Sequence, residues 1–232
     1  MPAARRPPAK TMGKSKKTTG AGNTKAKGTD SVLAYLRRAD PIMADIIELV
    51  GPELGEARAG RPPDHYGALV RAIVGQQLST KAAASIFGRL TERFEGRTPT
   101  PQEVLDDDPE ELRVAAGLSR AKAGYLRSLA EHVLSGELEL ERLDELPDEQ
   151  VIAELTAVKG LGVWTSHMFM MFHLKRPDVL PVGDLGIRKA IERAYGLEGL
   201  PDPATMEQIA EPWRPQRTLA CRYLWRSLDN EP

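Results

Sequence analysis

Apolar residues recur at intervals of three and four along most of the chain after residue 31, the spacing that places them on one face of an α-helix. The first such segments lie at 32–36 and 43–50, with Pro41 between them, and a loop rich in glycine and proline follows over 51–63. The alternation of apolar and polar residues typical of a half-buried strand is nowhere sustained. The pattern therefore predicts an all-α protein.

A second group of apolar positions covers residues 65–94 and is interrupted by Gly, Gln and Ser residues at 75–79. This interruption predicts two helices with a polar joint between them. Turns containing Gly or Pro separate three further segments of helical spacing, so we expect additional helices at 109–116, 119–134 and 148–157.

The distribution of charge changes this picture at the N-terminus. The 232 residues carry a net charge of −1, but residues 1–30 alone carry +7, which leaves −8 for the remainder. This basic segment lacks large apolar side chains and is predicted to be a disordered tail. Either an arm that attracts nucleic acid or a solubilising leader fits it equally well. No apolar run approaches the roughly 20 residues that span a bilayer, so we expect an intracellular protein without membrane contact.

The cysteine and histidine residues limit the cofactors that the protein can bind. Its single cysteine, Cys221, cannot form an intramolecular disulfide or supply the four thiolates of an iron–sulfur cluster. His65, His132, His167 and His173 are dispersed along the sequence without the spacing of metal ligands. The sequence therefore predicts no cofactor, no iron–sulfur cluster and no metal site made by side chains.

The segment AVKGLGVW, residues 157–164, places two glycines between apolar helical runs. Gly160 and Gly162 permit a tight turn and a close approach of another backbone from outside. The helix that follows presents unpaired amides, which favour an anion such as a phosphate. A glycine turn that merely connects two helices is the alternative, and the turn by itself does not exclude it.

Asp184 follows Pro-Val-Gly and precedes the apolar run LGIRKAI, which places it at the start of a helix. Aspartate is a preferred N-cap residue because its carboxylate accepts hydrogen bonds from the first amides. The same carboxylate, fixed in direction, can stabilise a cation that develops during a reaction. Capping alone and capping combined with catalysis both remain open at this stage.

Two segments, LTAVKGLGVWTSHMFMMF and VLPVGDLGIRKA, together resemble the helix-hairpin-helix DNA glycosylases, specifically the branch of 3-methyladenine DNA glycosylase II. ALVRAIVGQQLSTKAAASIFGRL and GLSRAKAGYLRSLAEHV resemble two further parts of that family. These segments occur in the family's order and cover most of residues 67–195. The resemblance implies two mainly helical lobes with an active cleft between them.

Under this resemblance the chain divides into four parts. The boundaries are a disordered basic tail at 1–30, N-terminal helices at 31–66 that pack with the C-terminal lobe, a lobe containing the helix-hairpin-helix at 67–180, and a C-terminal lobe at 181–232 that opens with the catalytic aspartate.

The resemblance implies a monofunctional DNA glycosylase of base excision repair. It would flip alkylated purines such as 3-methyladenine out of double-stranded DNA and hydrolyse the N-glycosidic bond. Relatives with lyase activity carry a lysine at the position of Trp164, so lyase activity is not expected. The protein is expected to act as a monomer in the cytoplasm or at the nucleoid. The preferred lesion stays open, and a non-catalytic DNA-binding module is the alternative.

The resemblance also implies roles for particular residues. Asp184 corresponds to the catalytic aspartate, as a stabiliser of the sugar cation or as a base toward water. The base pocket is expected to include Trp164, Met168 and Leu185, the last two replacing aromatic residues of the bacterial archetype. Gln77 corresponds to the wedge that fills the gap left by a flipped nucleotide.

The DNA backbone is expected to contact the hairpin and the helix that follows it. Residues assigned to this contact are Lys159, Gly160, Gly162 and Thr165, and the carbonyls of Val158 and Leu161 are candidate ligands of a monovalent cation. Arg120, Lys122 and Arg188 are further candidates for phosphate contacts, with solvated surface charges as the alternative.

Overall fold

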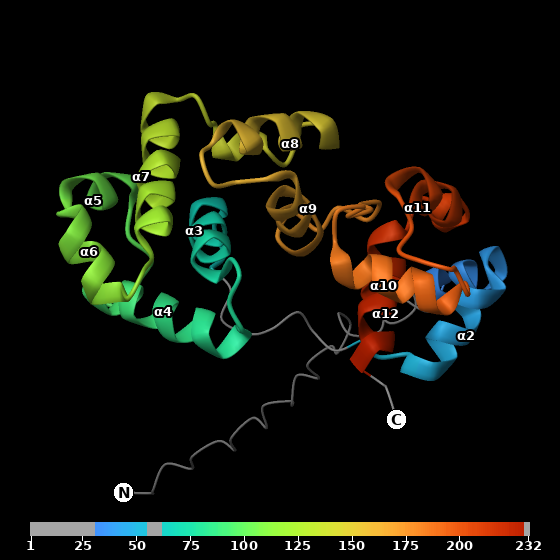
Figure 1. Ribbon diagram of the computed structural model, residues 1–232. Helices are drawn as coiled ribbons and strands as arrows, with labels where there is room; N and C mark the ends of the chain where they lie inside the picture. The colour runs from blue at the N-terminus through green and yellow to red at the C-terminus, as the bar shows by residue number, and fades with distance from the viewer. Residues whose placement is uncertain (1–30, 55–61, 230–232) are drawn as a thin grey trace, which may run out of the picture.

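The computed structural model describes residues 31–54 and 62–229, and within these residues the chain is helical throughout, without a strand (Figure 1). The predicted all-α class is therefore confirmed. The predicted basic tail at 1–30 lies outside the described residues. None of the described helices combines the length and apolar composition needed to cross a membrane.

One lobe is built from the central part of the chain and packs around a long helix, α7. Its elements are α3 (His65–Gly75), α4 (Thr80–Arg93), α5 (Pro101–Asp106), α6 (Pro109–Ala116), α7 (Arg120–Ser135), η1 (Leu140–Arg142), α8 (Asp148–Ala157) and α9 (Val163–Phe172). Helix α7 packs against α3, α5 and α6 through buried residues that include Leu126 and Leu129. The short α5 and η1 were not expected, because one or two turns are too short to show helical periodicity.

The other lobe joins the two ends of the described chain. A helix at 31–39 and α2 (Pro41–Val50) lie beside α10 (Leu185–Ala194), α11 (Pro203–Ala210), η2 (Glu211–Trp213) and α12 (Arg217–Asp229) (Figure 1). Helix α12 packs against both α2 and α10. The N-terminal helices thus complete the core of the C-terminal lobe.

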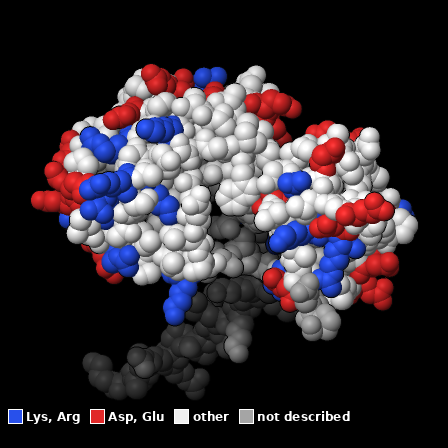
Figure 2. All heavy atoms as spheres, viewed as in Figure 1, with Lys and Arg blue, Asp and Glu red and all other residues white. Residues whose placement is uncertain are grey.

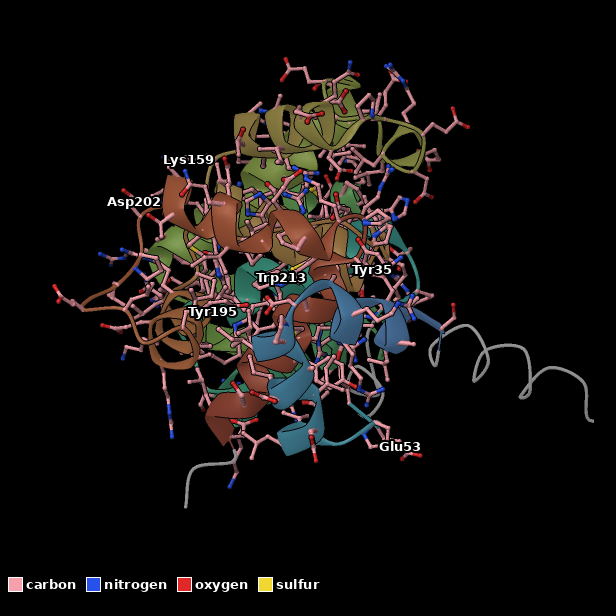
Figure 3. All side chains as sticks on the ribbon, turned by 90° about the vertical axis from the view of Figure 1, so that its right-hand side faces the viewer. Tyr35, Glu53, Lys159, Tyr195, Asp202 and Trp213 are labelled. Atoms are coloured by element: carbon pink, nitrogen blue, oxygen red, sulfur yellow. The ribbon has the colours of Figure 1, made fainter. Side chains whose placement is uncertain are left out.

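Asp40 fixes the junction between these early and late segments. As N-cap of α2, its Oδ1 accepts hydrogen bonds from the amides of Ile42 and Met43 at 2.9 and 3.2 Å. Its Oδ2 accepts from Nε1 of Trp213 at 2.8 Å and from the hydroxyl of Tyr195. Both aromatic rings lie inside this lobe (Figure 3), and burial together with the Asp40 carboxylate raises the pKa of Tyr195. This aspartate is a structural cap with all of its acceptor positions in use.

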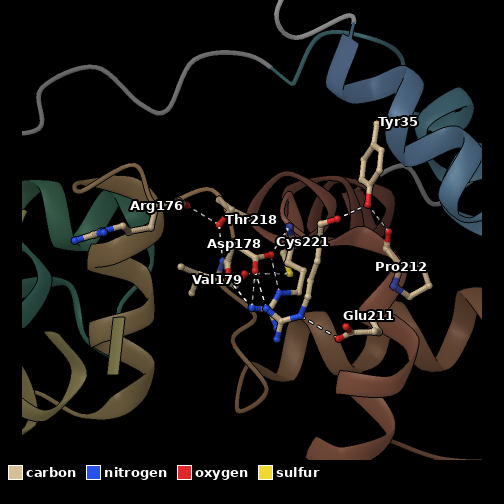
Figure 4. Close-up of polar contacts among 10 residues, drawn as sticks. Tyr35, Arg176, Asp178, Val179, Glu211, Pro212, Thr218 and Cys221 are labelled. Atoms are coloured by element: carbon tan, nitrogen blue, oxygen red, sulfur yellow. Dashed lines mark hydrogen bonds and ion pairs between the residues drawn. The ribbon is translucent and has the colours of Figure 1, made fainter. Parts of the chain in front are cut away.

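The connection between the lobes, residues 173–183, is anchored on both sides. Arg176 donates from Nη2 to three main-chain carbonyls of the central lobe at 2.8 to 3.1 Å. On the other side, the hydroxyl of Thr218 on α12 donates to the carbonyl of Arg176 at 2.7 Å and accepts from the amide of Val179 at 3.0 Å (Figure 4). Asp178 forms ion pairs with Arg217 and Arg214, each at 2.8 Å. These contacts fix the position of α10 relative to α9.

Candidate active site

Asp184 is the N-cap residue of α10, and three donors orient its carboxylate. Oδ1 accepts from the amide of Ile187 at 2.8 Å and from Nε1 of Trp225 at 2.9 Å, while Oδ2 accepts from Nε1 of Trp164 at 2.7 Å. A carboxylate offers about four acceptor positions. The described residues fill three and leave one on Oδ2, although the residue is only 8% exposed. Asp184 therefore caps a helix and also presents a fixed acceptor.

Trp225 on α12 is a residue of this site that the sequence did not reveal. Its ring stacks on Phe172 of α9, with centroids 5.8 Å apart and planes at 28°. A Cβ atom at Gly186 would lie 3.1 Å from both the Trp225 ring and the Asp184 carboxylate, so this glycine leaves room for their approach. A tryptophan on an amphipathic helix ordinarily indicates core packing. Only the fold brings it beside an aspartate 41 positions earlier.

A cavity of about 330 Å³ lies between α3, the start of α4 and α9. Two of the three predicted pocket residues, Trp164 and Met168, line it, together with Phe169 and Phe172, which were not predicted. Leu185 is not part of the lining, and it is 53% exposed in the first turn of α10 beside Asp184. Asp184 does not line the cavity itself, but Trp164 does, and its indole N–H joins the cavity wall to the carboxylate by one hydrogen bond.

Gln77 lies between α3 and α4 with its side chain exposed. Its φ of 55° is in the left-handed region, where a residue with a side chain is uncommon. The next residue, Leu78, is also exposed and lines the cavity. The residue expected to act as a wedge therefore projects from a strained loop at the edge of the cavity.

The hairpin joins α8 to α9, and its two glycines serve different needs. Gly160 has a φ of 93°, and a Cβ atom there would lie 2.2 Å from the ring of Tyr125, so both conformation and packing require glycine. Gly162 has a φ of −101°, and nothing lies within 4 Å of the position of a Cβ atom. The molecule's own packing does not require glycine at 162, and the space beside it is open to an external group.

Helix α9 begins at Gly162 without a side-chain cap, whereas α2, α3, α4 and α10 each begin at an Asp or Ser whose side chain accepts a helix amide. Uncapped amides at an exposed helix start attract anions. Lys159, at the surface of the same hairpin (Figure 3), adds a positive charge. Thr165, also expected to contact the DNA backbone, is buried and lines the cavity.

Lysine and arginine side chains lie on the visible face of both lobes, mixed with aspartate and glutamate (Figure 2). Among the further phosphate candidates, Arg120 is exposed, while Arg188 donates from Nε to the carbonyl of Pro201 at 3.0 Å. The ammonium group of Lys122 donates to the carbonyls of Val74 and Gln76, each at 2.8 Å, so two of its three N–H donors are used within the protein.

Two histidines that are dispersed in sequence, His65 and His173, meet beside the C-terminal end of α9. Nδ1 of His65 lies 2.8 Å from Nε2 of His173, and Nε2 of His65 lies 3.2 Å from a carboxylate oxygen of Asp144. Burial and the nearby His65 lower the pKa of His173, which lines the cavity. In the described part of the chain, no group of three or more His, Cys, Asp or Glu side chains could bind a metal ion.

Comparison with known proteins identifies the family of this chain. The model of the HhH-GPD superfamily of base excision DNA repair proteins matches residues 70–215. DNA-3-methyladenine glycosylase 1 of Schizosaccharomyces pombe is 37% identical over 195 residues, which cover 83% of this chain and 85% of that protein. This chain belongs to the HhH-GPD superfamily. The resemblance expected from the hairpin and aspartate segments is thereby confirmed.

Solved structures of HhH-GPD proteins have the same fold. The structure of 3-methyladenine DNA glycosylase from Schizosaccharomyces pombe in complex with abasic DNA matches with a TM-score of 0.74 at 35% identity, covering 84% of this chain and 95% of that chain. DNA-3-methyladenine glycosidase from Bacillus halodurans matches with a TM-score of 0.71 at 37% identity, covering 84% and 87%.

Proposed function

We propose that this HhH-GPD protein is a monofunctional DNA glycosylase, which removes alkylated purines such as 3-methyladenine from double-stranded DNA in base excision repair and acts as a monomer. The observation that carries the proposal is the Asp184 carboxylate, which is fixed by three donors, one of them a tryptophan of the aromatic cavity, and which the described residues leave with one acceptor position available.

The chemistry required of Asp184 follows from the substrate. A purine alkylated at N3 or N7 is positively charged and leaves readily, taking the electron pair of the bond to C1′. The sugar then gains positive charge, until water adds to C1′ and loses a proton. A preorganised charge aimed at this position is worth about 10²–10³ in rate. Asp184 can supply that charge and can also orient or deprotonate the water.

The cavity supports recognition of an electron-poor base. Trp164, Phe169 and Phe172 provide aromatic surface, and Met168 adds a polarisable thioether. Burial and His65 hold the pKa of His173 below its usual value, which favours the neutral imidazole in this lining. An alkylated purine that stacks on Trp164 would therefore meet aromatic and sulfur-containing side chains, while Arg71, the charged residue of the lining, lies with its guanidinium 5.3 Å from the centroid of the Phe87 ring.

The absence of lyase activity forms part of the proposal. A lyase reaction through a Schiff base requires an amine beside C1′. At the corresponding hairpin position this chain has Trp164, and its indole nitrogen donates to Asp184. Hydrolysis that leaves an intact abasic strand is the outcome expected from this site.

Binding of DNA would use the hairpin and the wedge loop together. The uncapped start of α9, with Gly162 open to solvent, fits a phosphate, and Gln77 fits the gap left by a flipped nucleotide. The carbonyls of Val158 and Leu161 would hold a monovalent cation; among the described residues the Val158 carbonyl accepts one main-chain hydrogen bond, from the Leu161 amide at 3.0 Å, and its second lone pair could bind the cation. Such a cation would add positive charge beside the phosphate.

The test uses duplex DNA that carries alkylated purines. The unaltered protein and its Asp184→Asn variant are incubated with this DNA, released bases are separated by chromatography, and strand breaks are counted with and without alkali. We expect base release by the unaltered protein, at least 100-fold slower release by the variant as estimated for one preorganised group, and breaks only after alkali.

Asp40→Asn is the matched control, because Asp40 also caps a helix and accepts from two aromatic donors in the same lobe. We expect it to lower the free energy of unfolding while base release by the folded protein continues. Tight binding to the DNA without base release from any alkylated or etheno substrate would instead identify a non-catalytic DNA-binding module.

A further inference from the structure

The loop that carries Gln77 has only long hydrogen bonds of its own and is also held by neighbouring elements. Within the loop, the amides of Gln76 and Leu78 reach the carbonyls of Ile73 and Gly75 only at 3.3 Å. A residue held in the left-handed region persists only where its surroundings determine it. The conformation that projects Gln77 therefore depends on neighbouring elements.

The first of these neighbours is Lys122 on α7. Its ammonium group donates to the carbonyls of Val74 and Gln76 at 2.8 Å each, at the C-terminal end of α3, where helix carbonyls lack amide partners. A cation at this end also interacts favourably with the helix dipole. Burial lowers the pKa of Lys122, as expected for an ammonium group turned away from solvent. Lys122 thus satisfies the carbonyls of the residues before and after Gly75, at the C-terminal end of α3.

The second neighbour is the hairpin. Nε2 of Gln76 donates to the carbonyl of Gly160 at 2.7 Å. Gly160 is the residue whose positive φ and close contact with Tyr125 fix the turn. One residue of the loop therefore contacts the turn that would hold a DNA phosphate, and the next residue in the sequence is the wedge.

We propose that Lys122 and Gln76 are positioning residues for the wedge. They tie Gln77 to the hairpin and to α7, so that the wedge and the hairpin form one rigid unit. Binding of the DNA backbone by the hairpin is then coupled to insertion of Gln77 into the duplex. This inference rests on the proposed glycosylase function. It assigns Lys122 a role in base flipping in place of a direct phosphate contact.

The experiment compares two substrates that differ only in the cost of flipping. In one duplex the alkylated purine is paired normally, and in the other it lies opposite an abasic site, where no base pair has to be broken. Lys122→Met removes both hydrogen bonds to the loop. We expect about a tenfold or larger loss of single-turnover base release from the paired duplex, the effect of losing a hydrogen bond from a charged group, and a much smaller loss from the unpaired one.

Arg127→Met is the matched control. Arg127 lies on the same helix and donates from Nη1 to the carbonyls of Val104 and Leu105 at 3.2 Å each, at the end of α5. It removes a similar cation–carbonyl contact far from the wedge loop, so release from the two substrates should change equally. Lys122→Arg, which retains donors, should restore part of the activity on the paired duplex, and Gln76→Leu should reproduce the selective loss.

A second readout follows binding without chemistry. Fluorescence of 2-aminopurine placed beside the lesion reports unstacking, and we expect Lys122→Met to reduce the signal at saturating protein. Equal losses on both substrates, or full activity on the paired duplex, would overturn the inference. So would a uniform weakening of DNA binding with a salt slope smaller by about one, the signature of a lost phosphate contact. If the unaltered protein releases no base from either duplex, the proposed function itself fails, and the inference fails with it.

Discussion

Replacing Trp225 with phenylalanine isolates one of the three hydrogen bonds that orient Asp184. The smaller ring keeps an aromatic surface against Phe172, whose centroid lies 5.8 Å from that of Trp225, but it removes the indole N–H that donates to Oδ1 at 2.9 Å. The amide of Ile187 continues to hold Oδ1, and Trp164 continues to hold Oδ2. In this variant the Asp184 carboxylate remains in the site with two of its three donors, and its orientation is less firmly fixed.

The expected size of the effect follows from the bond that is lost. A hydrogen bond to a charged group contributes about 1.5–3 kcal/mol. If all of that energy served to aim the carboxylate at C1′, the rate would fall by about 10- to 150-fold, since about 1.4 kcal/mol corresponds to a factor of ten. Two donors remain, so we expect the lower end of this range. The loss should be smaller than that of Asp184→Asn, which removes the charge.

The assay is single-turnover base release from alkylated duplex DNA at saturating protein, which measures the chemical step apart from binding. Thermal unfolding of Trp225→Phe is measured in parallel, so that the rate is compared only where the variant is folded. Trp164→Phe, which removes the donor to Oδ2, supplies a second test of the same idea. A folded Trp225→Phe protein with an unchanged rate would refute the view that this hydrogen bond sets the orientation of Asp184.

Three further predictions concern the hairpin, the connection between the lobes and the dependence of stability on pH. Gly160→Ala should lower the free energy of unfolding by about 1–3 kcal/mol, the cost of a strained backbone, because the φ of residue 160 is 93° and a Cβ atom there would meet the Tyr125 ring. The same change should weaken DNA binding by the hairpin. Urea unfolding measures the first effect and DNA titration the second. Thr218→Val should cost about 1–3 kcal/mol in urea unfolding, because two main-chain groups of the connection lose a buried partner. Burial lowers the pKa of His167 and His173 in the folded protein, so the unfolded chain binds more protons than the folded protein as the pH falls through about 6.5. The free energy of unfolding should therefore decline below that pH. The variant in which both histidines are replaced by phenylalanine should show a shallower decline when urea unfolding is measured across this pH range.

The sequence predicts the elements of this fold more completely than it predicts the site. Helical spacing and the interruption after Gly75 locate α3, which buries a continuous apolar face, and α4, which packs Leu90 with the partly buried Ile86 and Phe87. The hairpin and Asp184 are recognisable because their local conformations demand particular residue types. The contact of Trp225 with Asp184 depends on how α12 packs on α10, and no local pattern in the sequence predicts that packing. The inward direction of Lys122 is hidden for the same reason, since an exposed helix lysine has the same sequence context.

Two aspartates show why a cap alone does not identify a catalytic residue. Asp40 and Asp184 each begin a helix, each accept from main-chain amides in the first turn, and each accept from two aromatic side chains. The four donors around Asp40 use all of the roughly four acceptor positions of a carboxylate, whereas the three around Asp184 leave one. The remaining position lies on Oδ2, the oxygen that also accepts from Trp164 of the cavity wall. A helix cap is available for chemistry only if it keeps such a free acceptor position, and the paired Asp-to-Asn variants measure that difference directly.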